Sequence, residues 1–342
     1  MFARILKLVE QSTIKLSIVT GTLLLFTYFA FRLWYINNNP YLIVFSILLF
    51  IAELHTFIHL LGMFYSLWPR KYSDFSKNSI DPSVQVNAFI CVCGEPTEIV
   101  EPTIKGALAA ADYYQKTVNP EFKPRIIVLN DGYVAKKDNW YEIQQLCQKY
   151  NVSHIARTVP GGFKAGNINN ALRETQDTDP DKTVDIIFDS DMSAKPECFV
   201  ELLKPYADHN VDFVQSPQRY KNESSWVAQS SAAHQKFFFD YVCPAKAHDN
   251  ALFLCGTNFS IKRSALNDVG GMDEEFITED YATSIKLHSI GKKGVFVPQV
   301  LAIGCAPANL KEYFNQQTRW AKGSFDTSFK YLKHLVFGPM TP

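Results

Sequence analysis

Two long apolar stretches near the N-terminus constrain this chain more than any other feature. Residues 14–36 and 41–68 are almost wholly apolar or small, and a polar break at residues 37–40 separates them. Each is long enough to cross the apolar core of a bilayer as a helix. Aromatic residues gather near their ends, as they do at membrane interfaces: Trp34, Tyr35, Tyr41, Tyr65 and Trp68. The sequence therefore predicts an N-terminal segment, residues 1–72, that forms a hairpin of two transmembrane helices rather than a signal peptide.

The charges that flank these stretches predict an orientation. Lysine and arginine occur before the first stretch and after the second, but not between them: Arg4, Lys7, Lys15, Arg70, Lys71 and Lys77. The positive-inside rule then puts both ends of the hairpin in the cytoplasm. Glu53, His55 and His59 interrupt the second stretch, and polar groups inside a membrane line a pathway or a helix contact. We expect Glu53 to face a partner helix from outside this chain.

From residue 83 to about 335 the pattern changes to that of one α/β domain. Short apolar runs predict strands, and helical patterns with apolar residues on one face lie between them. Their order implies a mostly parallel sheet covered by helices on both faces. The strands are expected at 84–93, 125–129, 153–156, 184–188 and 212–215, and the helices at 103–114, 139–150, 165–174, 196–207 and 310–331, with another that begins after Thr278. Pro102 would lie in a first helical turn, and Thr278 would be an N-cap.

Composition excludes some classes of partner. The formal net charge is zero and no basic run stands out, so nothing indicates nucleic-acid binding. The seven cysteines include no C-x-x-C pair, and most lie in apolar runs. We interpret them as reduced core residues in a cytosolic compartment rather than as zinc ligands or disulfides.

Two carboxylates follow the apolar run at 184–188. Asp189 and Asp191 stand where a buried strand ends, and ligands of open α/β sheets bind beyond the carboxyl ends of strands. Crowded carboxylates are costly unless a cation neutralises them, and Mg²⁺ bridges carboxylates to phosphates. The pair therefore predicts a metal–phosphate site, with a solvated turn or a helix cap as the alternative.

Other polar groups are expected near the same edge of the sheet. Asp131 ends a second strand, with a simple turn residue before Gly132 as the alternative. Residues 161–167 are glycine-rich and open a helix, so Lys164 is placed to reach a phosphate. Glu279 and Asp280 begin another helix, where acidic residues either complement the helix dipole or, with a raised pKa, act as a general base.

The helix at 310–331 carries a further candidate group. Gln316, Arg319 and Trp320 are spaced i, i+3 and i+4, so they share one face. Arginine binds phosphate in a bidentate manner, and the flat ring of tryptophan suits a sugar face. The alternative is an amphipathic helix with a buried tryptophan.

The order and spacing of these residues resemble the membrane-bound family 2 glycosyltransferases, the group of cellulose, hyaluronan and chitin synthases. The resemblance covers about residues 84–330. Further stretches are similar to the cellulose-synthase branch: Cys93-Gly94-Glu95-Pro96, Lys164-Ala165-Gly166-Asn167, Gln215-Ser216-Pro217-Gln218, Cys255-Gly256-Thr257-Asn258 and Ala306-Pro307.

The resemblance implies a GT-A fold that binds a nucleoside-diphosphate sugar, most simply UDP-glucose. Its implied roles are nucleotide-sugar binding by Glu95, Asp131, Lys164, Asp189, Gln316 and Arg319, binding of Mg²⁺ or Mn²⁺ by Asp189 and Asp191, and acceptor binding by Trp320. Asp280, beside Glu279, would deprotonate the acceptor hydroxyl. Attack at the anomeric carbon would invert it and extend a β-linked polysaccharide.

The sequence departs from the family pattern at its end. Family members continue past the tryptophan with more membrane spans, so residues 336–342 are expected to start a membrane region that is missing here or supplied by another subunit. Two other functions stay open. One is a non-processive transferase that adds one sugar to a lipid or glycan. The other is a catalytically silent, nucleotide-binding membrane regulator.

Overall fold

The computed structural model describes residues 2–38, 40–70, 73–176, 179–222 and 225–337. It divides into two compact units, one of Met1–Ser73 with Pro244–Lys246 and one of Asp74–Cys243 with Ala247–Pro342. Lys71, and residues 338–342 of the expected C-terminal membrane region, lie outside the described residues, as do the side chains of Arg4 and Lys7.

The first unit contains the helices α1 (Phe2–Asn38) and α2 (Ile43–Leu67), joined by a 3₁₀ turn at Pro40–Leu42. By length and composition, Glu10–Asn38 and Ile43–Leu67 are apolar enough to cross a membrane. Phe29 packs against Phe57 across the hairpin, with ring centroids 4.4 Å apart.

Glu53 pairs within this hairpin. Its carboxylate accepts hydrogen bonds from Tyr28 Oη at 2.7 Å and from Arg32 Nε at 2.9 Å, both on α1. The expectation that Glu53 faces a helix from outside the chain is therefore wrong. An ion pair across the hairpin thus neutralises the half-buried carboxylate of Glu53 locally. His55 and His59 remain exposed, with ring centroids 4.3 Å apart.

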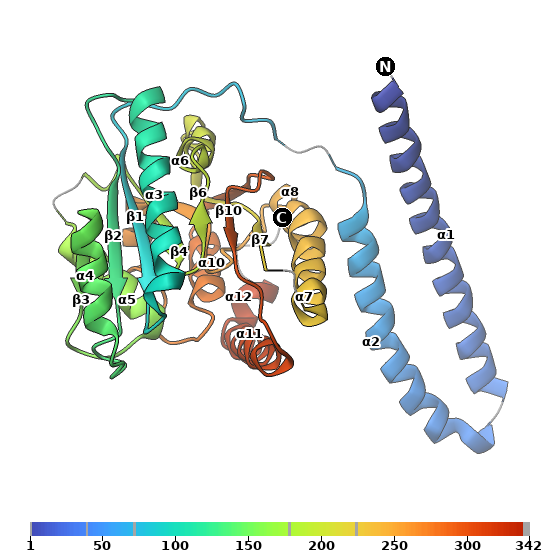
Figure 1. Ribbon diagram of the computed structural model, residues 1–342. Helices are drawn as coiled ribbons and strands as arrows, with labels where there is room; N and C mark the ends of the chain where they lie inside the picture. Colours follow the sequence, from blue (N-terminus) through green and yellow to red (C-terminus); the bar gives the residue numbers. More distant parts are fainter. Residues whose placement is uncertain (1, 39, 71–72, 177–178, 223–224, 338–342) are drawn as a thin grey trace. The chain divides into compact units, whose positions relative to one another are not determined.

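A seven-stranded sheet forms the centre of the second unit (Figure 1), in the order β3-β2-β1-β4-β8-β6-β9. The pairs β3/β2, β2/β1, β1/β4 and β6/β9 are parallel, whereas β8 is antiparallel to both neighbours. The strands are β1 (Gln85–Val92), β2 (Arg125–Asn130), β3 (Ser153–Ala156), β4 (Thr183–Asp189), β6 (Val211–Gln215), β8 (Phe259–Lys262) and β9 (Lys293–Phe296). The expected mostly parallel sheet is confirmed, although neither β8 nor β9 was expected from the sequence.

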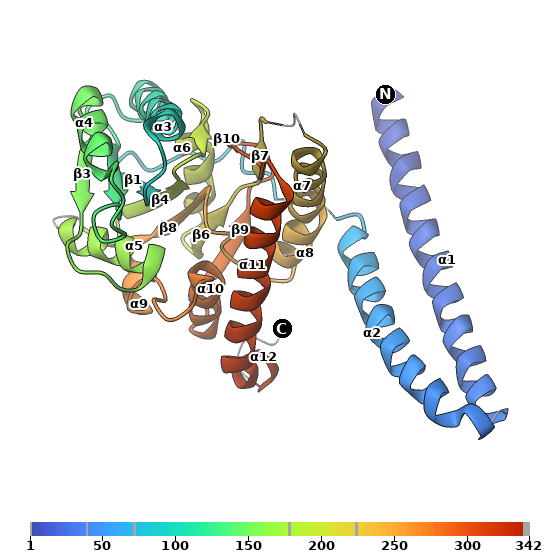
Figure 2. The same cartoon turned by 60° about the horizontal axis from the view of Figure 1, so that its bottom comes forward.

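Helices cover both faces of this sheet (Figure 2). Strand residues alternate between two cores, so Ala88 and Ile90 pack on one face and Phe89 on the other. The first face carries α3 (Thr97–Thr117), α4 (Trp140–Tyr150) and α6 (Cys198–Leu203), followed by the 3₁₀ turn Lys204–Ala207. The second carries α5 (Phe163–Glu174), α9 (Arg263–Asp268) and α10 (Glu279–Ser289).

The remaining elements form a smaller layer. It contains a three-stranded sheet, in which β10 (Ala302–Gly304) lies between β5 (Ser193–Ala194) and β7 (Gln218–Tyr220). The helices of this part are α7 (Trp226–Phe237), a π-helical turn at Phe238–Val242, α8 (Cys243–His248), α11 (Leu310–Lys330) and α12 (Leu332–Phe337).

Three local expectations need correction. The helix α3 begins at Thr97, so Pro102 lies inside it rather than in its first turn, where it removes one backbone hydrogen bond. Thr278 occupies the N-cap position of α10 as expected, but its side chain makes no cap bond in the described structure, and its Oγ1 atom lies 3.3 Å from Thr327 Oγ1 of α11. Cys93 is exposed rather than part of the core.

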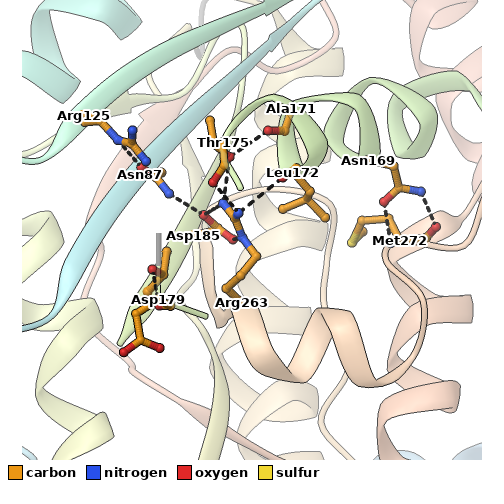
Figure 3. A network of polar contacts seen from close by, with 11 residues as sticks. Asn87, Arg125, Asn169, Ala171, Leu172, Thr175, Asp179, Asp185, Arg263 and Met272 are labelled. Atoms are coloured by element: carbon orange, nitrogen blue, oxygen red, sulfur yellow. Dashed lines mark hydrogen bonds and ion pairs between the residues drawn. The ribbon is translucent and has the colours of Figure 1, made fainter. Parts of the chain in front are cut away.

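A buried ion pair ties the sheet together at the end of β4 opposite Asp189 (Figure 3). The Asp185 carboxylate accepts bonds from Arg263 Nη2 at 2.7 Å and from Asn87 Nδ2 at 3.0 Å. Arg263 also donates to the carbonyl oxygen of Thr175 at 3.1 Å. Because Asp185 is fully buried, its charge requires these partners. The network joins β1, β4, α5 and α9.

Candidate active site

Three parallel strands end together at the candidate site. The strand β1 lies between β2 and β4, with Cys91 opposite both Leu129 and Asp189. Asp189 is the last residue of β4, and Asp131 follows β2 directly. The two acidic strand ends therefore flank the end of β1, as expected for parallel strands. Glu95 lies just beyond β1, where its carboxylate accepts a bond from the Cys93 amide at 2.6 Å.

Asp131 is paired with Arg157, which the sequence analysis did not single out. Arg157 Nε and Nη2 lie 2.6 and 2.7 Å from the two Asp131 carboxylate oxygens. Both side chains are about nine-tenths buried, with exposed fractions of 10% and 8%. Arg157 belongs to no motif recognised in the sequence, and only its place between β3 and the glycine-rich turn could have drawn attention to it.

Lys164 connects the glycine-rich turn to the end of β4. Its ammonium group forms an ion pair with Asp189 and donates a hydrogen bond to the Gly256 carbonyl oxygen at 2.6 Å. Burial alone would lower the pKa of Lys164, but the nearby Asp189 carboxylate outweighs this and raises it. Lys164 therefore stays charged at neutral pH.

Asp191 lies two residues beyond Asp189, in the turn that follows β4. Its Oδ2 atom accepts a hydrogen bond from the Cys305 amide at 3.0 Å. Burial, followed by the charge of Asp189, raises the pKa of Asp191 to about 6. A further positive charge beside Asp189 and Asp191, in addition to the Lys164 ammonium group, would favour the ionised forms of both carboxylates.

Glu279 and Asp280 form the first turn of α10, as the sequence predicts. Glu279 is buried, and burial with the Asp280 charge raises its pKa to about 8. Burial also raises the pKa of Asp280 to about 6, although the Tyr281 amide donates to its Oδ1 atom at 2.8 Å and opposes the shift. The hydrogen bond from the Tyr281 amide favours the ionised form of Asp280, which is the form that can accept a proton.

Gly256 lies between Lys164 and Asp280. A Cβ atom added to Gly256 would be 3.3 Å from Asp280 Oδ2, and its φ of +78° favours glycine. The Gly256 carbonyl oxygen accepts the Lys164 bond described above. The two acidic motifs of the sequence, at 189–191 and 279–280, are therefore linked through Lys164 and Gly256. Lys164 pairs with Asp189, and the Cβ position of Gly256 lies beside Asp280.

Two motifs that the sequence analysis noted only for their resemblance form a buried hydrogen-bonded network. Gln215 Nε2 donates to the Thr257 carbonyl oxygen at 2.9 Å, and Gln215 Oε1 accepts from the Cys255 amide at 2.8 Å. Gln218 Nε2 donates to the Cys255 carbonyl oxygen at 2.6 Å. The Asp189 amide donates to Thr257 Oγ1 at 2.9 Å. This network fixes the Gly256 loop against the end of β4.

The helix α11 packs on the start of α10. A Cβ atom on Gly323 would be 2.6 Å from the Thr278 side chain, so glycine permits this close approach. Gln316 and Trp320 are half-buried on α11, and Arg319 is exposed. Gln316 Oε1 is buried without a hydrogen-bond partner among the residues that the structure describes. A buried acceptor of this kind calls for a donor group.

Comparisons with known proteins agree with this architecture. Residues 186–341 match the model of the glycosyl transferase family group 2. The chain is 30% identical over 284 residues to the cellulose synthase catalytic subunit of Xanthomonas axonopodis pv. citri, and 30% identical over 282 residues to that of Pseudomonas fluorescens. Both alignments cover 80% of this chain and 36% of the relative, so the chain spans about a third of their length.

A solved structure shows the same fold. The mannosyltransferase of Pyrobaculum calidifontis, in complex with GDP-Man and Mn²⁺, matches 94% of this chain and 76% of its own with a TM-score of 0.58 and 15% identity. The second unit therefore has the GT-A fold of glycosyltransferases. Residues 186–341 carry a family 2 glycosyltransferase domain, and the chain is related to cellulose synthase catalytic subunits.

Proposed function

We propose that this chain is an inverting glycosyltransferase that moves a sugar, most simply glucose from UDP-glucose, to the growing end of a β-linked glycan. One observation carries the proposal. Lys164, paired with Asp189 at a parallel strand end suited to phosphates, donates to the carbonyl oxygen of Gly256, and a Cβ atom on that glycine would lie 3.3 Å from Asp280 Oδ2. A phosphate-binding group and a candidate base therefore meet at one place, as sugar transfer requires.

The donor would bind along the strand ends. Asp131 and Glu95 would contact the nucleoside, and Lys164 the diphosphate. Asp189 and Asp191 fit a Mg²⁺ or Mn²⁺ ion, because both offer carboxylate oxygens. Burial, and then the charge of Asp189, raises the pKa of Asp191, and a cation would favour its ionised form. Among the described residues no group of three or more His, Cys, Asp or Glu side chains forms a metal site. The donor's phosphates and water would therefore supply the other ligands. Such an ion neutralises charge on a diphosphate leaving group.

The chemical step follows from Asp280. The acceptor hydroxyl oxygen attacks the anomeric carbon, the bond from that carbon to the phosphate oxygen breaks, and the hydroxyl proton passes to Asp280. Attack from the face opposite the diphosphate turns an α-linked donor into a β linkage. Glu279, with its higher pKa, holds its proton near neutral pH and limits repulsion beside Asp280.

The acceptor would lie over α11. Trp320 would stack on the terminal sugar, while Arg319 and Gln316 would contact the diphosphate. Gln316 also has a buried oxygen that needs a donor, which a sugar hydroxyl supplies.

The hairpin of α1 and α2 would anchor the enzyme in the membrane. The flanking basic residues support a cytoplasmic position for the second unit, where nucleotide sugars are available. Further membrane helices, from a longer chain or another subunit, would complete a path for the polymer.

A donor panel tests the proposal. The full chain in detergent is incubated with UDP-glucose, UDP-N-acetylglucosamine, UDP-glucuronate and GDP-mannose, and released nucleotide and product linkage are measured. We expect release from one UDP-sugar and a β-linked product. A product one sugar longer than its acceptor would indicate the non-processive transferase. Nucleotide binding without release from any donor would indicate the silent regulator.

A further inference from the structure

The turn before α5 has a strained backbone. Gly161, Gly162 and Phe163 have φ values of +143°, +63° and +47° in succession. Phe163 is the unusual one of the three, because a residue with a side chain rarely adopts a positive φ, and Phe163 is 67% exposed, so packing of its ring does not enforce this conformation. Strained residues persist only where their surroundings hold them in place. Some group must therefore hold this turn.

Arg157 makes the contacts that hold it. Its Nη2 atom donates to the Phe163 carbonyl oxygen at 2.8 Å, and its Nη1 atom donates to the Gly161 carbonyl oxygen. The same guanidinium makes the bidentate pair with Asp131. Arg157 thus fastens both ends of the turn to the end of β2.

Gly166 provides a second, independent observation. A Cβ atom on Gly166 would lie 2.5 Å from Arg157 Nη1 and 2.2 Å from the Gly161 carbonyl oxygen. Its helical backbone needs no glycine, so the close approach of the Gly161 carbonyl oxygen and of the guanidinium bound to it explains the residue. The Gly166 amide also donates to the Gly162 carbonyl oxygen at 2.7 Å. The first turn of α5 is therefore built around Arg157.

Arg157 is better placed to position other groups than to bind a ligand. Four of its five N–H groups already donate to Asp131, Gly161 and Phe163. The residue after Phe163 is Lys164, whose ammonium group reaches Asp189 and Gly256. A change in the turn would move Lys164 away from both.

We propose that Arg157 is a positioning residue for the donor site: it clamps the strained turn 161–163 to Asp131 and thereby holds Lys164 against Asp189. The expected effect of Arg157 on nucleotide binding rests on the proposed function. Its role in holding the turn 161–163 does not.

A double-mutant cycle on the full chain tests the inference. Calorimetry measures the affinity for UDP and for GDP with Mn²⁺ in the wild type, Arg157→Lys, Lys164→Met and the double variant. Lys164→Met should weaken binding about tenfold to a hundredfold, and Arg157→Lys about tenfold, because each loses bonds to a charged group. When Lys164 is already absent, Arg157→Lys should change affinity less than about twofold.

Two further variants sharpen the test. Gly166→Ala should act like Arg157→Lys, because the new methyl group would meet both the Gly161 carbonyl oxygen and the guanidinium and so separate them. Arg173→Lys is the matched control, since Arg173 is exposed on the same helix. The affinity of Arg173→Lys for UDP and GDP should match that of the wild type. Equal losses from Arg157→Lys in both backgrounds would show that Arg157 touches the nucleotide itself and would overturn the positioning role.

Hydrogen exchange separates this inference from the proposed function. Without nucleotide, Arg157→Lys and Gly166→Ala should speed exchange at the Gly166 amide at least tenfold, while Arg173→Lys leaves it unchanged. Unchanged exchange in Arg157→Lys would overturn the clamp. If the wild type binds neither UDP nor GDP, the proposed function fails, and the exchange result still decides whether Arg157 holds the turn.

Discussion

Asp280 Oδ2 lies only 3.3 Å from the position that a Cβ atom on Gly256 would take. The carbonyl oxygen of the same glycine accepts a bond from Lys164 at 2.6 Å. One residue is therefore bonded to the phosphate-binding side of the candidate site and leaves room for the base on the other. A change at this residue should affect chemistry more than stability.

Gly256→Ala should lower transfer about tenfold or more, because the methyl group crowds the base and the φ of +78° strains an alanine. The loss of stability should be about 1 kcal/mol. Gly291→Ala is the control, since Gly291 has a φ of +82° and open space around its Cβ position. It should lose similar stability and keep full transfer. Equal transfer rates in the two variants would contradict the role of the Gly256 contact.

Asp280→Asn should keep nucleotide binding and lower transfer by roughly two to four orders of magnitude, because the amide cannot accept the acceptor proton. Glu279→Gln should be far milder near neutral pH, because Glu279 already holds a proton there. Transfer rates, nucleotide affinities and thermal midpoints of both variants test whether Asp280 is the base. Near-normal transfer in Asp280→Asn would remove Asp280 from the mechanism.

The same assignment predicts a pH dependence. A base with a pKa of about 6 is protonated below that value. The transfer rate should therefore fall as pH drops through 6, by about tenfold per pH unit at lower pH. A profile that stays flat from pH 7 to pH 5 would argue against Asp280 as the base.

Much of this site could be predicted from the sequence, because its residues end or begin regular elements. Asp131 and Asp189 follow apolar strand runs, and Glu279 begins a helical pattern. Arg157 could not be predicted, because its partners Asp131, Gly161 and Phe163 are brought together by tertiary structure. The strand β8 was missed for a similar reason. Its antiparallel direction depends on the neighbours β4 and β6, and β9, which was also missed, pairs with β6 at the edge of the sheet.

Trp320→Ala should lower transfer to a glycan acceptor while UDP still binds, because the change removes a stacking surface and leaves the strand ends intact. Trp320 is only half-buried, so the thermal midpoint should change little. Acceptor-dependent transfer, UDP affinity and thermal midpoint are measured together. A loss of roughly 3–5 kcal/mol in stability, with UDP binding lost in parallel, would mean that Trp320 is a core residue instead.

Asp185→Leu should destabilise the second unit by about 3–5 kcal/mol, because it leaves the buried charge of Arg263 without its partner. Glu275→Ala is the comparison, since it breaks the exposed pair with Lys330 and should cost at most about 1 kcal/mol. Denaturant unfolding of the detergent-solubilised chain measures both. Similar small effects would mean that the network of Figure 3 contributes little to stability.

Asp191 links cation binding to the pH dependence of stability. Its pKa is raised in the folded protein from 3.8 to about 6, so between these values the folded state holds a proton that the unfolded state has lost. The stability that this proton contributes is present below pH 3.8 and lost as pH rises through 6. A divalent cation favours the ionised pair of Asp189 and Asp191, and so should restore stability above pH 6.

Thermal midpoints from pH 4 to pH 7.5, with and without Mn²⁺ and UDP, test this link. The wild type should lose stability as pH rises and regain part of it when Mn²⁺ and UDP are added together. In Asp191→Asn, which cannot ionise at this position, the loss across this range should be smaller and the Mn²⁺-dependent gain should disappear. UDP binding that is equally tight in EDTA and in Mn²⁺ would remove the cation from the mechanism. A Mn²⁺-dependent gain that survives in Asp191→Asn would place the ion elsewhere.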